Sequence, residues 1–258
     1  MNDLTNMTWI ELRKAVRSKL PLWIAIASLF MPVAIAFLIF VSKNPDISER
    51  LGLVGAKANL TAYAATDWPA YLVFFNQMVA AAGFIFLVMA ISWVFGREFA
   101  DGTVKDLLAV PVHRASILMA KFIVMAIWSA ALTLVMIAAG LLMGILINLP
   151  GAAPDLIGAA RDLVGTACLV VGVVFPFAFF ASVGRGYLLP FGIAILMLMT
   201  ANLVVVLGWG EYFPWAVPML FAQDKSSLTP ISYWIVLLTS VTGMFATYLW
   251  WMNADQNR

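Results

Sequence analysis

Charge is scarce in this sequence. Of its 258 residues, only 11% are Asp, Glu, Lys or Arg, whereas 64% are hydrophobic. A soluble domain carries about 25% charged and about 45–50% apolar residues. A chain this apolar could not cover a water-facing surface with polar groups, so the composition predicts an integral membrane protein.

Residues with reactive side chains are also scarce. The single cysteine, Cys168, lies in an apolar run, which excludes a disulfide within the chain and a cysteine-based metal site. The single histidine, His113, lies in a polar segment, so it cannot activate Ser182 inside an apolar run. The HExxH, CxxC and GxSxG motifs are absent. We therefore expect no catalytic residue, no metal site and no cofactor.

Two further absences limit the partners. No GxxxxGK[ST] phosphate loop occurs, so the chain does not bind and hydrolyse ATP by that route. The formal net charge is only +2, and no dense basic patch with interleaved aromatic residues is present. We therefore expect no nucleic-acid partner, and the lipid bilayer is the partner that the composition implies.

Six apolar runs are long enough to cross a membrane as helices. A helix needs about 20 apolar residues to span about 30 Å of hydrocarbon. The runs cover residues 22–41, 71–95, 117–147, 156–183, 188–207 and 231–251. We predict an all-α fold with one six-span transmembrane domain over residues 22–251 and a short cytoplasmic tail at residues 252–258.

The chain before the first run has the pattern of an amphipathic helix. One side of residues 8–20 is mainly apolar, with Trp9, Leu12, Ala15, Val16 and Leu20. The other side is polar, with Glu11, Arg13, Lys14, Arg17 and Ser18. A basic amphipathic helix ahead of a span typically lies in the membrane interface. We predict such an interface helix over residues 1–21; the alternative is a cytosolic tail that only follows the charge rules.

The placement of basic residues predicts the orientation of the chain. An even number of spans puts both termini on one side of the membrane. The segments on that side, including the loop at residues 96–116, hold ten of the 15 Lys and Arg residues. Because positive charge is enriched in cytoplasmic loops, we expect both termini and this loop to be cytoplasmic.

The segment at residues 209–230 is too apolar for a solvated loop. Pro214 and Pro218 interrupt it, so we predict a broken outer hairpin before the last span. Irregular backbone at membrane depth is tolerated where protein covers it or where it lines a cavity. Glu211 at its start is either a solvated interfacial acid or part of a gate.

Polar residues inside the spans are few and mostly uncharged. Asn76, Gln77 and Asn202 are candidates, with Glu211, for contact with a transported substrate. Hydrogen bonding between helices explains the span residues equally well. Proton- and ion-coupled transporters usually need acidic residues within the membrane, and the interiors of these runs lack them. A secondary transporter or channel that works without a partner is the alternative, and this absence disfavours it.

The most informative polar segment lies between the second and third runs. Thr103 can cap a short helix at residues 104–110, with an acidic residue three positions after the cap. Gly102 permits the turn into this helix, and Pro111 ends it. A short helix with apolar side chains in a cytoplasmic loop suits docking into a groove of a partner protein. The other interpretation is a helix that lies on the membrane surface.

A spaced set of residues runs through this segment. It consists of Glu98, Gly102, Thr103, Lys105, Leu107, Leu108, Pro111, Val112, Arg114 and Lys121. The set resembles the motif of the type-2 permeases of ABC transporters, and within that family those of the bacitracin-resistance and lantibiotic-immunity type. The order of elements is similar as well, with an interface helix, six spans and a broken hairpin before the last span.

This resemblance implies a function. In that family the segment forms a coupling helix that contacts a separate ATPase subunit. The implied coupling residues are Arg97, Glu98, Gly102, Thr103, Lys105, Leu107, Leu108, Pro111 and Arg114. The chain would then be the permease subunit of an ATP-driven exporter, working with a second identical or related permease chain. Substrate would pass along the first, second and fifth spans, whose apolar residues suit an antimicrobial peptide, a drug or a lipid-linked molecule.

Overall fold

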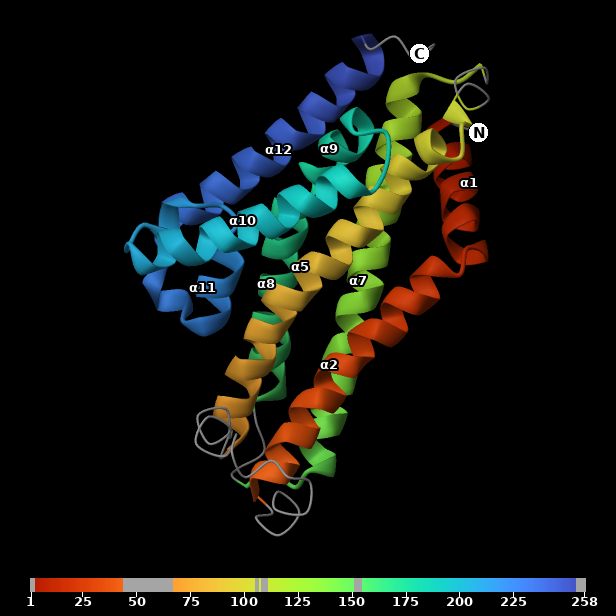
Figure 1. Ribbon diagram of the computed structural model, residues 1–258. Helices are drawn as coiled ribbons and strands as arrows, with labels where there is room; N and C mark the ends of the chain where they lie inside the picture. Colours follow the sequence, from red (N-terminus) through yellow and green to blue (C-terminus); the bar gives the residue numbers. More distant parts are fainter. Residues whose placement is uncertain (1–2, 44–66, 105–106, 108–110, 151–154, 254–258) are drawn as a thin grey trace.

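The computed structural model describes residues 3–43, 67–104, 107, 111–150 and 155–253, and within these ranges it contains helices and turns but no strand (Figure 1). The helices are α1 (Asp3–Arg17), α2 (Leu20–Lys43), α5 (Trp68–Ala100), α7 (Arg114–Leu146), α8 (Leu156–Val174), α9 (Phe177–Val183), α10 (Leu188–Val206), α11 (Val217–Gln223) and α12 (Pro230–Asn253). Two single-turn 3₁₀ helices, Gly210–Tyr212 and Lys225–Ser227, flank α11.

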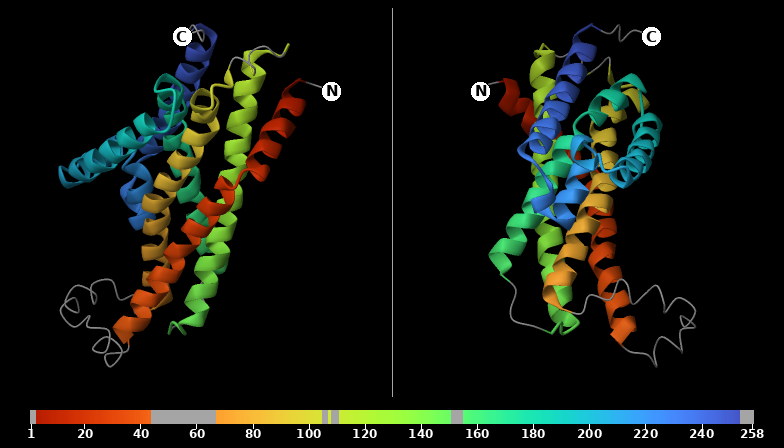
Figure 2. Two further views of the ribbon diagram at one scale, coloured as in Figure 1. Left: turned by 45° about the vertical axis from the view of Figure 1, so that its right-hand side comes forward. Right: turned by 90° about the vertical axis from the view of Figure 1, so that its left-hand side faces the viewer.

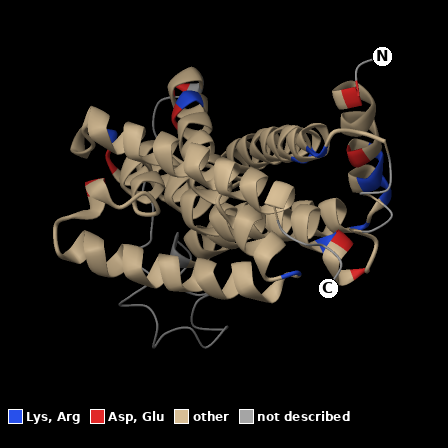
Figure 3. Ribbon diagram, turned by 90° about the horizontal axis from the view of Figure 1, so that it is seen from above, with Lys and Arg blue, Asp and Glu red and all other residues tan. Residues whose placement is uncertain are grey.

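Six segments of the described chain are long and apolar enough to cross a membrane, with α8 and α9 together forming the fourth. This confirms the predicted all-α membrane fold with six spans. The ends of α1 and α12 that lead to the two termini lie at the same end of the bundle, which we call the termini end (Figures 1 and 2). The opposite end is the distal end. Seen from the termini end, charged residues occupy short stretches of the ribbon and leave most of each long helix uncharged (Figure 3).

The helix α5 crosses the whole bundle and forms much of the core. Asp67 caps its start by accepting a hydrogen bond from the Ala70 amide at 3.0 Å. Near this end, glycines of α7 let the two helices approach closely, since a side chain at Gly144 would collide with Trp68. The Tyr71 hydroxyl donates to the Gly140 carbonyl at 2.7 Å, so the same close contact satisfies a buried polar group.

The fourth span is broken rather than continuous. The helix α8 ends at Val174 and α9 begins at Phe177, because Pro176 has no backbone amide to continue the hydrogen-bond ladder. Gly243 of α12 packs directly against Pro176, where any Cβ would collide with the proline. The kink therefore creates a close contact between the fourth and sixth spans.

The predicted broken hairpin before the last span is present. The helix α11 folds back against α5 and α8, and its Val217 and Ala222 are buried. Trp215 donates its indole N–H to the Val173 carbonyl at 3.1 Å, close to the break in the fourth span. The bundle therefore covers part of α11 and the backbone next to it, whereas Trp209 and residues 223–227 are exposed.

Candidate functional site

The chain leaves α5 through a left-handed glycine at the termini end. Gly102 has φ +70°, and its amide donates to the Phe99 carbonyl at 3.3 Å. The Thr103 amide donates to the Glu98 carbonyl at 2.9 Å, which completes a Schellman C-cap. The Leu107 amide then donates to the Thr103 carbonyl at 3.1 Å, so helical hydrogen bonding resumes at Thr103. The turn expected at Gly102 is therefore present, whereas the capping box expected at Thr103 involves Asp106, which lies outside the described residues.

The middle of the predicted coupling helix lies outside the described residues. These positions are 105, 106 and 108–110, and they include the coupling candidates Lys105 and Leu108. Leu107, between these positions, and Val112, after them, are half-buried and pack against a small cluster of Met7, Ile117 and Ala120. Gly102, Thr103 and Pro111 are exposed. Leu107 and Val112 therefore anchor the segment on α1 and α7, while three of its residues are open to a partner.

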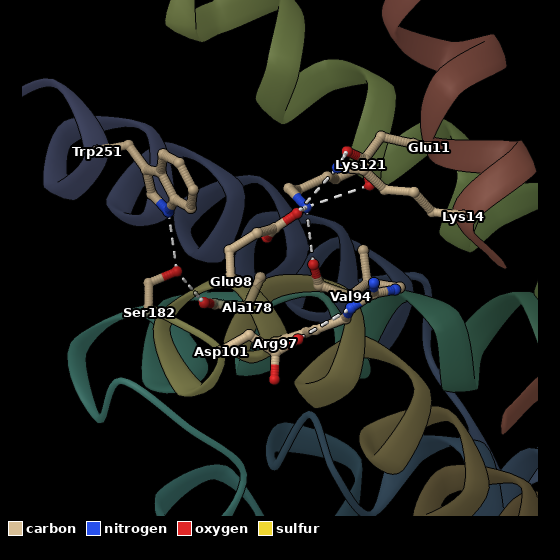
Figure 4. A network of polar contacts seen from close by, with 10 residues as sticks. All are labelled: Glu11, Lys14, Val94, Arg97, Glu98, Asp101, Lys121, Ala178, Ser182 and Trp251. Carbon is tan, nitrogen blue, oxygen red and sulfur yellow. Dashed lines mark hydrogen bonds and ion pairs between the residues drawn. The ribbon is translucent and has the colours of Figure 1, made fainter. Parts of the chain in front are cut away.

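A buried ion pair joins α5 to α7 beneath this segment. The Lys121 side chain is 0% exposed, and its Nζ lies 2.7 Å from Oε2 and 2.8 Å from Oε1 of Glu98 (Figure 4). The same ammonium donates to the Val94 carbonyl at 2.9 Å. A buried charge is tolerated only when it is paired and hydrogen-bonded, and Lys121 meets both conditions.

The helix α1 completes the network. Oε2 of Glu11 accepts from Lys121 at 3.3 Å, and Oε1 of Glu11 pairs with Lys14 at 2.7 Å. Lys14 also reaches Oε1 of Glu98 at 3.3 Å. Two carboxylates and two ammonium groups therefore neutralise one another across three helices. We call Glu11, Lys14, Glu98 and Lys121 the four-charge cluster (Figure 4).

The cluster changes the ionisation of its members on α1. Burial by itself raises the pKa of Glu11, but the charges of Lys121 and Lys14 outweigh it, so the pKa lies below the usual value of 4.5. Burial by itself lowers the pKa of Lys14, but the Glu11 carboxylate outweighs it, so the pKa lies above the usual 10.5. Both side chains therefore stay charged at neutral pH.

This arrangement corrects two expectations from the sequence. The N-terminal helix was predicted with its apolar and polar residues on opposite sides, yet its buried residues are Met7, Glu11 and Ala15, while Trp9 and Val16 are 55% and 75% exposed. The side that faces the bundle is therefore mixed, and Glu11 is buried there because it finds complementary charges. The span interiors were expected to lack charge, but α7 begins at Arg114, which puts the buried Lys121 two turns inside it.

The two arginine candidates occupy different surroundings. Arg97 pairs with Asp101 at 3.3 Å on an exposed face and lies over the Trp93 ring, 5.0 Å from its centroid. Arg114 donates to the Trp251 carbonyl at 2.8 Å in the last turn of α12. A cation at a helix C-terminus satisfies carbonyls that have no partner within the helix. Arg114 therefore fixes the start of α7 to the last span, a contact that the sequence did not indicate.

A close backbone contact supports the end of α5. A Cβ at Gly96 would lie 2.9 Å from the Gly186 carbonyl oxygen, so only glycine fits without displacement. Nearby, the Trp251 indole donates to the Ser182 hydroxyl at 2.9 Å, and Ser182 donates to Ala178 O at 2.8 Å. Three elements are therefore packed together at the termini end: α5, α12 and the turn that joins α9 to α10.

The four substrate-pathway candidates do not come together. Asn76 is buried and lines a distal-end cavity of about 470 Å³, which Asp162 and Lys225 also line. Gln77 is half-buried on α5, and exposed Asn202 donates to the Leu198 carbonyl of its own helix at 2.8 Å. Glu211 accepts from the Thr229 hydroxyl at 3.1 Å. The four side chains therefore lie in different surroundings rather than in one site.

No group of three or more His, Cys, Asp or Glu side chains that could hold a metal ion is present in the part of the chain that the structure describes. At the termini end, buried ion pairs support an exposed turn between the second and third spans. These features define a multi-pass helical membrane protein in which a loop at the termini end is held by contacts with three helices.

The chain belongs to the ABC-2 family of transporter proteins, whose family model matches residues 7–202. It is also 28% identical to the bacitracin transport permease protein BCRB of Bacillus licheniformis over 218 residues, or 83% of this chain and 97% of the relative. No solved structure matches the chain. The protein is thus an ABC transporter permease with the six-span fold, and the matched region includes the whole four-charge cluster.

Proposed function

We propose that this chain is the membrane-spanning subunit of an ATP-driven exporter, and that a separate ATPase subunit docks on the segment between α5 and α7. Two observations support this coupling. The sequence has no phosphate loop, so ATP hydrolysis must come from another chain. The segment exposes Gly102, Thr103 and Pro111 and lies next to a buried ion pair. A rigidly held surface of this kind suits a partner that moves the helices by moving the segment.

The four-charge cluster is the observation that carries the proposal. A partner that moves an isolated loop would only bend that loop. Here the segment leaves α5 directly after Glu98, and Glu98 is bonded to Lys121 of α7 and to Lys14 of α1. Movement of the segment is therefore transmitted to three helices together. Glu98 is only 6% exposed, so its proposed role is to support the contact with the ATPase rather than to form it.

The proposed cycle follows from this connection. When the ATPase pair closes on ATP, the grooves that hold the coupling segments of two permease chains move. The helix α5, which has 33 residues and no proline beyond its first turn, tilts with α7 as a rigid rod. The cavity between the two permease chains then changes from open to the cytoplasm to open to the outside. The nine coupling candidates act either at the docking surface or in its support.

The docking surface is tested with substitutions in the segment between α5 and α7. Thr103→Arg and Leu108→Asp should each reduce the amount of ABC ATPase that co-purifies with the chain by about tenfold or more, because a central interface contact contributes about 2 kcal/mol. Gln223→Arg, an exposed change at the distal end, serves as the control. Unchanged co-purification and unchanged transport in both variants would show that this segment is not the coupling site.

The proposed cargo is an amphipathic molecule, and the name of the relative makes bacitracin the first to test. Cells that express the chain with its ATPase should survive higher bacitracin concentrations than cells that express either chain alone. Loss of this protection on Glu98→Gln, with normal membrane levels of the protein, would tie it to coupling. Equal protection without the ATPase would favour a transporter that works alone.

A further inference from the structure

An amphipathic groove lies on the termini end between α2, α5 and α10. Its apolar half is a cavity of about 660 Å³ lined by Leu20, Met89, Leu188 and Phe191. Its polar half is a cavity of about 390 Å³ lined by Lys14, Arg17, Arg97 and Asp101. Trp93 and Tyr187 line both cavities, so the two halves are continuous.

The position of the groove matches the boundary between lipid tails and headgroups. The helices α2 and α10 begin at Leu20 and Leu188, so the apolar half lies beside the first turns of two spans. The polar half lies between α1 and the last turns of α5, where the second span ends. Trp and Tyr side chains prefer this boundary, and Trp93 and Tyr187 occupy the junction of the two halves.

The charge of the polar half favours an anion. Lys14 is neutralised within the four-charge cluster, and Arg97 is paired with Asp101. Arg17 is exposed and forms no ion pair with any residue that the structure describes, so its positive charge is uncompensated.

Tyr187 adds a neutral hydrogen-bond donor to the same half. Burial and the nearby Asp101 carboxylate raise the pKa of Tyr187, so its hydroxyl keeps its proton. No hydrogen bond of this hydroxyl occurs within the described chain, so it is free to donate to a ligand.

We propose that this groove binds an anionic membrane lipid of the leaflet that faces the termini end, with its headgroup at Arg17 and Tyr187 and an acyl chain against Met89 and Phe191. Basic pockets at the cytoplasmic ends of spans bind acidic headgroups in this way. An acyl chain suits the apolar half because Leu188, at its edge, is 87% exposed at the start of a span. The proposal depends on the groove alone and not on coupling to an ATPase.

The first test measures lipid preference. The purified full-length chain is exchanged into nanodiscs that contain phosphatidylglycerol and phosphatidylcholine with the same acyl chains, and the lipid retained after detergent extraction is counted by native mass spectrometry. We expect phosphatidylglycerol to be enriched, and Arg17→Gln to reduce that enrichment about fivefold, the effect of one basic contact. Arg13→Gln is the matched control, because Arg13 lies on the same helix and does not line the groove.

The second test locates the lipid. A phosphatidylglycerol with a photoreactive acyl chain should cross-link to peptides that contain Met89 or Phe191. No enrichment of the anionic lipid, an equal loss in Arg13→Gln, or cross-links only elsewhere would each overturn the proposal. So would efficient disulfide formation between two chains that carry Leu188→Cys in a Cys168→Ser background, because a second copy would then occupy the groove.

Discussion

Lys121 illustrates how one residue determines the properties of the termini end. Its ammonium is fully buried and is held by Glu98, Glu11 and a backbone carbonyl. Removal of one partner from a buried ion pair leaves the other charge without compensation, and this typically costs about 3–5 kcal/mol. An ion pair of the same lysine on a water-exposed surface would contribute little to the free energy of unfolding. The burial of Lys121, rather than its charge alone, makes it critical.

We therefore expect Lys121→Met to destabilise the protein strongly, by about 3–5 kcal/mol. The measurement is thermal unfolding of the purified chain in one detergent. The matched control is Lys225→Met, because Lys225 pairs with Asp162 at 2.9 Å but its side chain is 49% exposed. An exposed ion pair contributes about 0–1 kcal/mol, so this control should unfold close to the parent protein.

A double variant separates charge from packing. In Lys121→Met, Glu11 and Glu98 share one remaining cation, Lys14. If this excess negative charge causes the loss, Glu98→Gln in the Lys121→Met background should recover part of the stability, because the effects of contacting residues are not additive. Equal unfolding temperatures for Lys121→Met and Lys225→Met would show that the four-charge cluster does not stabilise the fold.

At the scale of the element, α5 ends where two backbones almost touch. Gly96 approaches the Gly186 carbonyl so closely that a methyl group has no room, and the atom in its way belongs to the backbone rather than to a flexible side chain. The turn between α9 and α10 thus rests on the last turns of α5. The same region includes Arg97 and Glu98, so its packing decides where the coupling segment begins.

Gly96→Ala should destabilise the protein by about 1–3 kcal/mol, the usual cost of overpacking a filled site. Gly192→Ala on α10 is the control, since no atom lies within 4 Å of a Cβ built there. Alanine favours the helix over glycine by about 0.5–1 kcal/mol, so the control should gain stability. Thermal unfolding under identical conditions compares the two, and a gain for both would contradict the close contact at Gly96.

The orientation of α1 is also decided at this scale. The amphipathic pattern of its sequence says only which residues share a face. Glu11 and Lys14 face the bundle because they form ion pairs with Lys121 and Glu98. Trp9 is exposed and can contact the membrane interface. A helix with both a charged and an apolar face can bind protein with one and lipid with the other.

At the scale of the whole molecule, both termini share one end of a six-span bundle (Figure 1). We expect that end to be cytoplasmic. In a Cys168→Ser background, Asp3→Cys and Asn253→Cys should resist a membrane-impermeant thiol reagent in intact cells, and Ser227→Cys should react. Permeabilised cells provide the control, in which all three should react. The reverse pattern in intact cells would invert the orientation and remove the coupling segment from the reach of a cytoplasmic ATPase.

The number of spans and the turn chemistry could be predicted because they depend on local sequence. A run of apolar residues has to cross the bilayer as a helix, and its length sets the span. Gly102 supplies the left-handed conformation that ends α5, because glycine adopts a positive φ without steric cost. These features need no knowledge of a distant partner. The break at Pro176 was not predicted, because the apolar run continues through it and a proline can also lie inside a continuous helix, as Pro32 does in α2.

The sequence by itself determined the membrane class, the six spans and the segment that joins the second and third spans. Only the tertiary structure decided which charges are buried. Glu11, Lys14, Glu98 and Lys121 come from three helices, and they meet because α7 packs against both α5 and α1. Helical periodicity fixes the face on which a residue lies but not what that face contacts, and a charge is buried only where an opposite charge from elsewhere in the chain offsets its loss of water.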